Sequence, residues 1–95
     1  MPAKKTATKA KKIEFKFRAP AGAKKVLLAG DFTNWEKGAI LMKPQGKIGE
    51  WIARVDLTPG EHEYKFMVDG IWHNDPNARQ KPNMWGSENS VIDIH

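Results

Sequence analysis

Hydrophobic and polar residues alternate along several short stretches of the chain. The alternation covers residues 13–18, 51–57 and 61–69, where apolar side chains recur at every second position. A period of two residues is typical of a strand with one buried face. Residues 26–29 are continuously apolar, which indicates a strand buried on both faces, and residues 91–94 are apolar enough to form a last strand. The pattern therefore predicts a protein built from strands.

Turn-forming residues separate these stretches. Residues 58–60 (Thr-Pro-Gly) are expected to turn the chain, and residues 69–70 (Asp-Gly) to form a two-residue hairpin turn. Residues 74–87 are rich in Pro, Asn and Gly, so we expect one long loop there. Helical periodicity of any length is absent. Short strands separated by turns predict an all-β, two-sheet sandwich over residues 13–95.

The net charge of +5 belongs to the start of the chain. Residues 1–12 hold five lysines and no acidic residue, whereas residues 13–95 hold 11 basic and 11 acidic residues. Because like charges repel and the segment has nothing to build a core, residues 1–12 are predicted to be a disordered tail. We favour a solubility role, since no aromatic residues interleave the lysines. The alternative is a basic arm that contacts an anionic partner such as nucleic acid.

Several kinds of chemistry find no support in the sequence. The chain has no Cys, which excludes disulfides, thiolate metal sites and a Cys nucleophile. No catalytic motif occurs, His73 and Asp75 are a weak metal pair without further ligands, and His62 is interpreted as a packing residue. We therefore predict a protein that is not an enzyme, with no metal or other cofactor. Without a membrane-length apolar stretch or a secretory signal, a cytoplasmic protein is expected.

The four tryptophans are the most informative residues. Trp51 lies in the alternation of residues 51–57 and is predicted to be in the core. Trp35, Trp72 and Trp85 lie in turns or loops, where an indole is costly surface unless something covers it. An indole face can cover the C–H face of a pyranose ring, and the hydroxyl rim then needs polar partners. Candidate polar partners are Lys65, Asn34, Asn74 and Asn89.

Several motifs occur in the order found in one family of carbohydrate-binding domains. They are G-D-F-T-N-W at residues 30–35, P-G-E-H-E-Y-K-F-M-V-D-G at 59–70, Trp72, D-P at 75–76 and N-S-V-I at 89–92. The sequence resembles the family-48 carbohydrate-binding module, in particular the glycogen-binding domain of AMP-activated protein kinase β subunits and the early-set domain of isoamylases. The resemblance spans residues 13–95 and implies an immunoglobulin-like (early-set) β-sandwich.

The same resemblance implies a carbohydrate site. In glycogen-binding members, the Trp of the first motif and the Trp after the V-D-G turn stack on glucose, which implies platforms at Trp35 and Trp72. A lysine and an asparagine that bond sugar hydroxyls correspond to Lys65 and Asn89. Trp85 stands where kinase members carry a Leu beside the sugar, so it changes the shape of the site and is expected to be a third contact.

Two serines complete the comparison with the family. Ser87 falls where kinase members carry a Thr that touches sugar, and Ser90 replaces the second Asn of an Asn-Asn pair, where it is expected to alter a turn. With the site residues retained, we predict a stand-alone, non-catalytic module that binds α-1,4-linked glucans such as glycogen, starch or maltooligosaccharides. The alternative is a protein-interaction or targeting module on the same fold, with the lysine tail on an anionic partner.

The partners follow from these two readings. A glycogen-metabolising enzyme or a kinase is the candidate protein partner, although the family's kinase-scaffolding extension does not follow residue 95, so a kinase-subunit role is not expected. Nucleic acid is expected only as a partner of the tail, and no membrane partner is expected.

Overall fold

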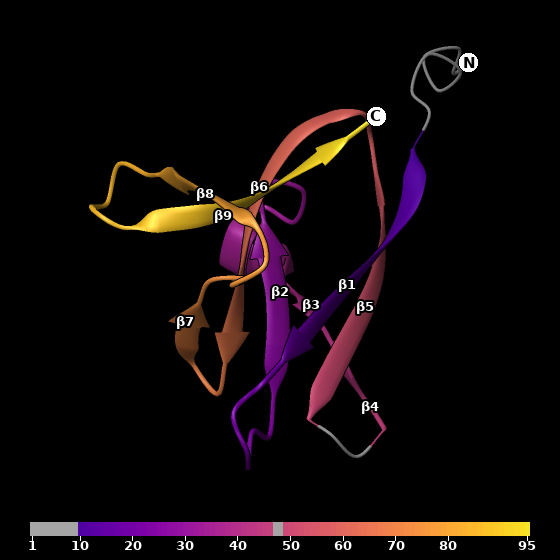
Figure 1. Cartoon of the computed structure of the whole chain (residues 1–95), viewed down its shortest axis with the longest axis vertical. Coiled ribbons are helices and arrows are strands. Elements are labelled where there is room, and N and C mark those ends of the chain that lie inside the picture. Colours follow the sequence, from indigo (N-terminus) through magenta and orange to yellow (C-terminus); the bar gives the residue numbers. More distant parts are fainter. Residues whose placement is uncertain (1–9, 47–48) are drawn as a thin grey trace.

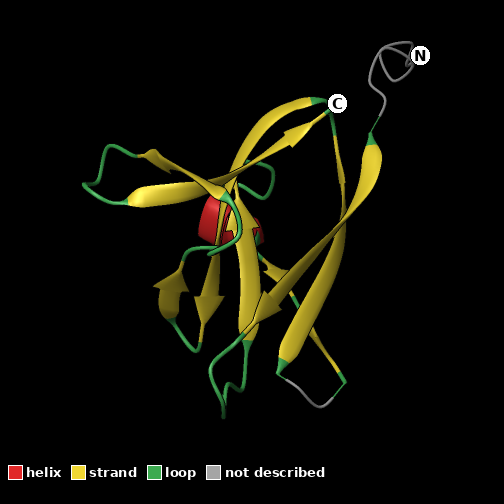
Figure 2. Cartoon of the chain, in the orientation of Figure 1, coloured by secondary structure: helices red, strands yellow, loops and turns green. Residues whose placement is uncertain are grey.

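The computed structural model describes residues 10–46 and 49–95, and nearly all regular structure in them is strand (Figures 1 and 2). The only helix in this part of the chain is the short 3-10 helix η1, Trp35–Gly38. The strands are β1 (Lys11–Arg18), β2 (Val26–Gly30), β3 (Ile40–Leu41), β4 (Lys43–Gln45), β5 (Glu50–Leu57), β6 (Gly60–Val68), β7 (Ile71–His73), β8 (Arg79–Pro82) and β9 (Glu88–Ile94). The predicted all-β class is confirmed.

The strands form two sheets that enclose one core. The smaller sheet has the order β1-β5-β4, and the larger has the order β3-β2-β6-β9-β8, with β7 also paired to β6. Figure 1 shows β1 and β5 together to the right of β2 and β6, while the connection between β8 and β9 projects to the left. The predicted two-sheet sandwich is therefore observed.

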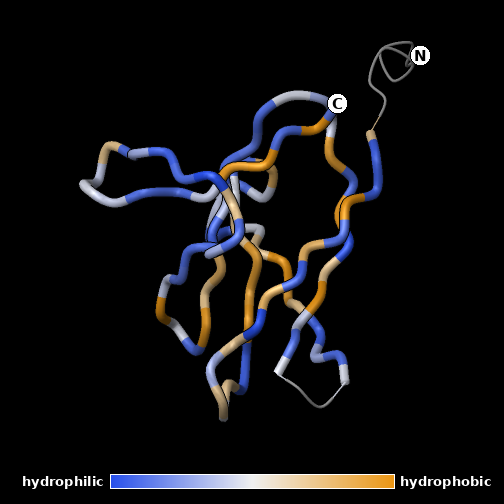
Figure 3. The backbone as a smooth tube through the Cα atoms, viewed as in Figure 1, coloured by the Kyte–Doolittle hydropathy of each residue, from blue (hydrophilic) through white to orange (hydrophobic). Residues whose placement is uncertain are grey.

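The smaller sheet rests on an unbroken antiparallel pairing of β1 with β5. The register runs from Lys11 opposite Leu57 to Arg18 opposite Glu50. The apolar residues of both strands face the same side, since residues directly opposite one another share a face. Figure 3 shows this alternation as orange and blue segments along both strands. The outer face is charged, and Arg54 Nη2 lies 3.0 Å from Glu14 Oε2.

The larger sheet is interrupted beside its central strand. One edge of β6 pairs with β2, from Tyr64 opposite Gly30 to Val68 opposite Val26. The other edge pairs with β9 up to Tyr64 and then with β7 from Phe66 onward. Lys65 is thus the position at which β6 changes neighbours. Because Tyr64 and Phe66 are buried in the core, Lys65 between them faces outward.

Aromatic rings fill the space between the sheets. Phe66 is completely buried, and its ring stacks on that of Phe17 with centroids 4.4 Å apart. Tyr64 packs edge-on against Phe15 at 4.9 Å and against Phe66 at 5.7 Å. The phenylalanines of β1 and the alternating residues of β6 therefore form one core shared by both sheets, as the period-two pattern predicts.

The structure corrects two sequence predictions about elements. Strand β1 begins at Lys11, two residues before the predicted domain start at Ile13, because Lys11 and Lys12 pair with the end of β5. Ala10 precedes the strand, and residues 1–9 of the predicted tail lie outside the described residues. The predicted loop 74–87 contains β8, which pairs with β9 through its backbone. Within residues 10–46 and 49–95, no helix has the length and hydropathy needed to cross a membrane.

A third correction concerns Trp51. The residue lies on the inner face, opposite Phe17, as its alternation predicts. Its indole is only half-buried, however, and packs against the edge of the core cluster. The reason is its place near the start of β5, where it lines a shallow surface depression together with Ala19 and Pro44. Trp51 is therefore an edge residue of the core rather than its centre.

Candidate functional site

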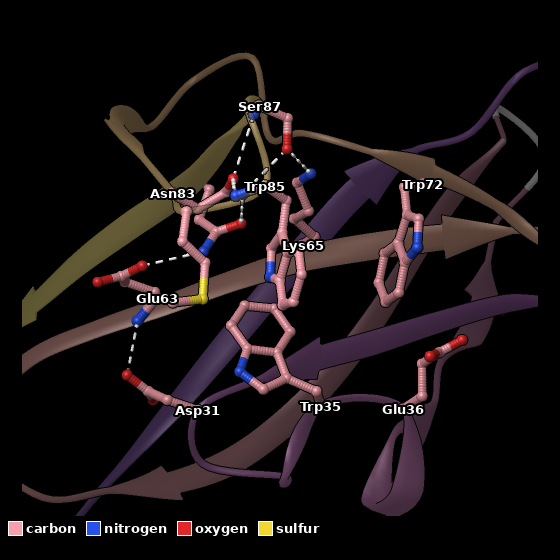
Figure 4. A pocket seen from close by; sticks show the side chains of 11 residues that line it. Asp31, Trp35, Glu36, Glu63, Lys65, Trp72, Asn83, Trp85 and Ser87 are labelled. Carbon is pink, nitrogen blue, oxygen red and sulfur yellow. Dashed lines mark hydrogen bonds between the residues drawn. The ribbon is translucent and has the colours of Figure 1, made fainter.

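The six residues implied by the family resemblance line one cleft of about 650 Å³. The cleft lies over the point where β6 changes neighbours, and Figure 4 shows the indoles arranged around Lys65. Five further residues line it that the sequence did not single out. The predicted residues are Trp35, Lys65, Trp72, Trp85, Ser87 and Asn89, and the additional ones are Asp31, Glu36, Glu63, Asn83 and Met84.

Trp35 is presented by a tight turn that follows β2. The Gly30 N–H donates to Thr33 Oγ1 at 3.0 Å, and the Thr33 hydroxyl lies 2.9 Å from the Trp35 carbonyl. Asn34 and Trp35 both adopt the left-handed conformation, with φ of 61° and 57°. This conformation is uncommon for a bulky residue and concentrates at functional sites. Gly30 is required because a Cβ there would lie 2.6 Å from the Glu63 carbonyl oxygen.

Asp31 and His62 fix the start of this turn to β6. The Glu63 N–H donates to Asp31 Oδ2 at 3.0 Å, and His62 Nδ1 lies 3.2 Å from Asp31 Oδ1. His62 Nε2 lies 2.8 Å from the Thr58 carbonyl oxygen, and the imidazole packs edge-on against Phe32 with centroids 5.9 Å apart. His62 is therefore a packing residue, as interpreted from the sequence.

Trp72 is presented by the predicted hairpin turn. Asp69 and Gly70 have φ of 48° and 86°, the pair of positive values that a two-residue type I′ turn requires. The Asp69 carboxylate accepts the N–H groups of Lys24 and Lys25, which ties the turn to the residues before β2. Trp72 lies opposite Met67 on the outer face, and 39% of its surface is exposed. The predicted hairpin is confirmed, although Trp72 belongs to a short strand rather than to a loop.

Trp85 projects from the loop that joins β8 to β9. Its surface is 83% exposed, as is that of its neighbour Met84. The loop itself is ordered by Asn83, whose Oδ1 accepts the N–H groups of Trp85 at 2.9 Å and Ser87 at 3.1 Å. The indole is thus solvent-exposed while the backbone that carries it is held.

A row of polar groups crosses the cleft between the indoles. Lys65 Nζ lies 3.4 Å from Ser87 Oγ. Asn89 is buried and its Nδ2 donates to Glu63 Oε1 at 2.9 Å, while its Oδ1 accepts from Asn83 Nδ2 at 3.0 Å. Lys65 and Ser87 therefore face the open cleft, whereas Asn89 already has internal partners for both ends of its amide.

Carboxylates surround the single lysine of the cleft. Glu63 Oε2 also lies 3.5 Å from Lys81 Nζ, and this ammonium group lies 2.9 Å from Glu61 Oε2. The hydrogen bond to Glu61 raises the pKa of Lys81, and the negative charges of both glutamates add to this effect. Glu36 is exposed at the rim beside Trp72 in Figure 4. The cleft therefore suits a neutral ligand better than a polyanion.

A buried polar cluster lies beneath the cleft. Tyr64 Oη donates to Asp75 Oδ2 at 2.7 Å, and burial, followed by the bond and the charge of Asp75, raises the pKa of Tyr64. The Asp75 N–H donates to Ser90 Oγ at 2.8 Å, so Ser90 is a buried strand residue that anchors the segment before β8. Asp75 is thus structural, and the described residues contain no group of three potential metal ligands.

Two of the asparagines considered from the sequence do not line the cleft. Asn34 is exposed in the turn before η1, and Asn74 Nδ2 donates to Gln80 Oε1 and to the Glu88 carbonyl oxygen. Closeness in sequence to an aromatic residue does not determine the direction of a side chain.

Residues 12–95 match the family described as the glycogen recognition site of AMP-activated protein kinase. The chain belongs to this family. The subunit beta-1 of AMP-activated protein kinase from Sus scrofa is 37% identical over 78 residues, which cover 82% of this chain and 61% of that relative. The beta-1 subunit from Rattus norvegicus is 40% identical, covering 82% of this chain and 27% of the relative. The beta-2 subunit from Mus musculus is 37% identical, covering 77% and 26%.

Membership of a glycogen recognition family confirms the predicted family and agrees with the prediction of a binding module rather than an enzyme. The chain spans less than two thirds of the length of these curated relatives.

Two of the five cleft residues that the sequence did not single out are polar groups held by a long-range contact. Asp31 and Glu63 approach one another across β2 and β6, which single-sequence patterns do not reveal. Asn83 could have been found from its spacing, since an Asn two residues before Trp85 and four before Ser87 fits a side-chain-capped turn.

Proposed function

We propose that this glycogen recognition domain binds α-1,4-linked glucans through the cleft between Trp35, Trp72 and Trp85. The observation that carries the proposal is the convergence of three indoles on one cleft with Lys65 at its centre. These indoles come from three separate segments, each fixed by its own hydrogen bonds. Exposed apolar side chains that gather in one place usually mark a site that a ligand or a partner covers.

The chemistry of the cleft suits a chain of glucose units. Each pyranose presents a C–H face that a flat indole can cover and a hydroxyl rim that needs hydrogen-bond partners. Trp35 and Trp72 would be the platforms, and Lys65 and Ser87 would meet hydroxyls at the rim. Trp85 would add a third contact. Asn89 would support the site from below, and its predicted direct contact with hydroxyls would use the second N–H or the second lone pair of its amide, because Glu63 and Asn83 occupy only one of each.

The carboxylates of the cleft support a binding role without hydrolysis. Glycoside hydrolysis needs two carboxyl groups that are free to act on either side of the bond. Of the three carboxylates that line the cleft in the described part of the chain, Asp31 is engaged with the Glu63 N–H and Glu63 with Asn89, which leaves only Glu36 where a pair is needed.

The proposal is tested by measuring maltoheptaose and glycogen binding of the Trp35→Ala and Trp72→Ala variants. Stacking on a ring of this size contributes about 1–3 kcal/mol, so each variant should bind about 5- to 150-fold more weakly. Trp51→Ala is the matched control, because Trp51 lies at the far edge of the core. It should lower the melting temperature and leave glucan affinity unchanged. If both cleft variants remain folded and bind glucan as tightly as the parent, the glucan site is not this cleft.

A kinase is the protein partner that we propose beside the glucan, because the relatives are named as kinase subunits, and a glycogen-metabolising enzyme is the alternative, because the family is described as a glycogen recognition site. Such a partner would place the module in the cytoplasm. A Trp35→Ala/Trp72→Ala double variant separates the two functions, since it should lose glucan and retain a partner that binds elsewhere. Loss of both together would indicate that the partner also occupies the cleft.

A further inference from the structure

Asn83 uses every polar atom of its side chain within the cleft. Its Oδ1 accepts the N–H groups of Trp85 and Ser87, at 2.9 and 3.1 Å. Its Nδ2 donates to Ser87 Oγ at 2.9 Å and to Asn89 Oδ1 at 3.0 Å. The backbone closes the same turn, because the Asn83 N–H donates to the Ser87 carbonyl oxygen at 2.9 Å. Figure 4 shows Asn83 between the loop and the strand.

The donor and acceptor roles in these hydrogen bonds are set by one group on β6, the Glu63 carboxylate. The Glu63 carboxylate can only accept, so the amide of Asn89 must turn its Nδ2 toward it. Asn89 Oδ1 then faces Asn83, and because this oxygen can only accept, Asn83 must donate to it from Nδ2. Asn83 Oδ1 is left to face two backbone donors, those of Trp85 and Ser87. Every donor in this chain of contacts meets an acceptor, so the amide orientations are set by the network.

The network connects the exposed Trp85 to the interior of the sheet. Asn89 is 7% exposed and belongs to β9, whereas Trp85 is 83% exposed and belongs to the loop. Asn83 is the group that bridges the two. It also shares Ser87 Oγ with Lys65 Nζ, so the same residue reaches the central lysine of the cleft.

We infer that Asn83 is a positioning residue that holds the Trp85 loop in its binding conformation before the ligand arrives. The inference rests on the proposed glucan binding. A ligand that meets an ordered loop does not have to order it, and each immobilised side chain otherwise costs about 0.5–1.5 kcal/mol on binding. All four side-chain hydrogen bonds of Asn83 are internal, so it acts on the ligand through the residues that it holds, mainly Trp85 and to a smaller extent Ser87.

A double-mutant cycle with maltoheptaose tests this route. Asn83→Ala should weaken binding about two- to twelvefold in the parent chain. In a Trp85→Ala background the same substitution should cause a clearly smaller loss of affinity, because only the contribution through Ser87 remains. Asn77→Ala is the matched control, because Asn77 is exposed and lies outside the cleft. It should leave affinity unchanged in both backgrounds.

Amide hydrogen exchange gives a readout that does not depend on glucan. Asn83→Ala should accelerate exchange of the Trp85 and Ser87 N–H groups while exchange in β6 stays unchanged. Unaltered exchange at both amides would overturn the inference, and so would an equal loss of affinity in the two Trp85 backgrounds. A parent chain that fails to bind any glucan would instead refute the proposed function, with the loop anchoring still decided by exchange.

Discussion

The central strands of the two sheets, β5 and β6, differ in how they pair with their neighbours. In the smaller sheet, β5 pairs with β1 along its whole length, without a break from Glu50 to Leu57. In the larger sheet, β6 pairs with β2 on one edge only from Tyr64 to Val68, and on the other edge it passes from β9 to β7 at Lys65. Both strands are of similar length and alternate in the same way. The difference lies in their neighbours.

That difference determines what the outer faces can do. On the smaller sheet, Glu14 lies between Arg54 at 3.0 Å and Lys16 at 3.8 Å, so the charged side chains of adjacent strands meet one another. On the larger sheet, the departing strands β7 and β9 carry Trp72 and the Trp85 loop to either side of Lys65. On the smaller sheet, continuous pairing places oppositely charged side chains next to one another, where they form ion pairs. Interrupted pairing opens a cleft.

Both sheets are expected to unfold as one unit around their shared core, and Phe66→Ala tests this with the largest expected effect. Phe66 is completely buried and stacks on Phe17 of the opposite sheet. Removing a buried Phe side chain costs about 3–5 kcal/mol, which a domain of this size can barely tolerate. Urea denaturation should show this loss of unfolding free energy, and amide exchange should accelerate in β5 and β6 alike.

Ile71→Ala is the control for this measurement, because Ile71 is 64% exposed and should change stability by less than about 0.5 kcal/mol. If Phe66→Ala accelerates exchange in β6 while β5 keeps its protection, the two sheets unfold as separate units and do not depend on one shared core.

The interruption beside β6 predicts a second effect, at Tyr64. Its hydroxyl donates to Asp75 just where β9 ends its pairing with β6. Tyr64→Phe keeps the ring contacts but leaves a half-buried carboxylate oxygen without its donor, which should cost about 1–3 kcal/mol at neutral pH. Denaturant unfolding of the parent and the variant measures this difference. An unchanged unfolding free energy would mean that Asp75 finds another donor.

Tyr64 also makes the stability of the fold depend on pH, with stability expected to fall at alkaline pH. The ordinary pKa of a tyrosine is 10.0, and burial together with Asp75 raises the pKa of Tyr64 in the folded chain. The unfolded chain therefore loses this proton first. The contribution of Tyr64 is fully present below about pH 10 and declines as the pH rises above it.

The parent's melting temperature should therefore fall more steeply above about pH 10 than that of Tyr64→Phe. Tyr64 is the only tyrosine of the chain, so tyrosinate absorbance reports on it alone. The absorbance should rise together with unfolding. A rise in the folded protein near pH 10 would contradict the burial of this hydroxyl.

The strands that could be predicted from the sequence are those with one face on the core. The alternation of β1, β5 and β6 reflects side chains that point alternately into the sandwich and out of it. Strand β8 reads Arg-Gln-Lys-Pro and buries no side chain fully, because it is held at the sheet edge by backbone bonds to β9. Its hydrophobic pattern contains nothing that could have predicted it. Trp51 was placed on the correct face, but its burial depends on distance from the sandwich end.

The candidate site divides in a similar way. The residues implied by the family resemblance all reach one cleft, because the motifs include the turns that aim them, such as the hairpin at Asp69. Asn83 and Glu63 could not be assigned from motifs, since their roles depend on partners in other strands. Asn89 illustrates the limit. It lines the cleft with the other implied residues, while its burial and its two internal bonds appear only in three dimensions.

The smallest expected effect concerns where the unbroken pairing of β1 with β5 ends. The last two pairs are Lys11 with Leu57 and Lys12 with Asp56, and Lys12 Nζ lies 3.6 Å from Asp56 Oδ1. Both charged groups are largely exposed, so the ion pair is worth at most about 1 kcal/mol. A chain that starts at Lys11 should therefore melt like the parent. A chain that starts at Ile13 should melt about 2–5 °C lower, because two pairs of the ladder are lost.

Glucan affinity should be unchanged in both shortened chains, since the cleft belongs to the other sheet. Binding to DNA, if any occurs in the parent, should lose its salt dependence with the first lysines, because each released counterion contributes to the slope. A melting temperature lowered by more than about 5 °C on removal of residues 1–10 alone would show that these residues contribute to the fold. The boundary between tail and domain would then lie earlier than Lys11, and the continuous ladder of the smaller sheet would be longer than its eight described residue pairs.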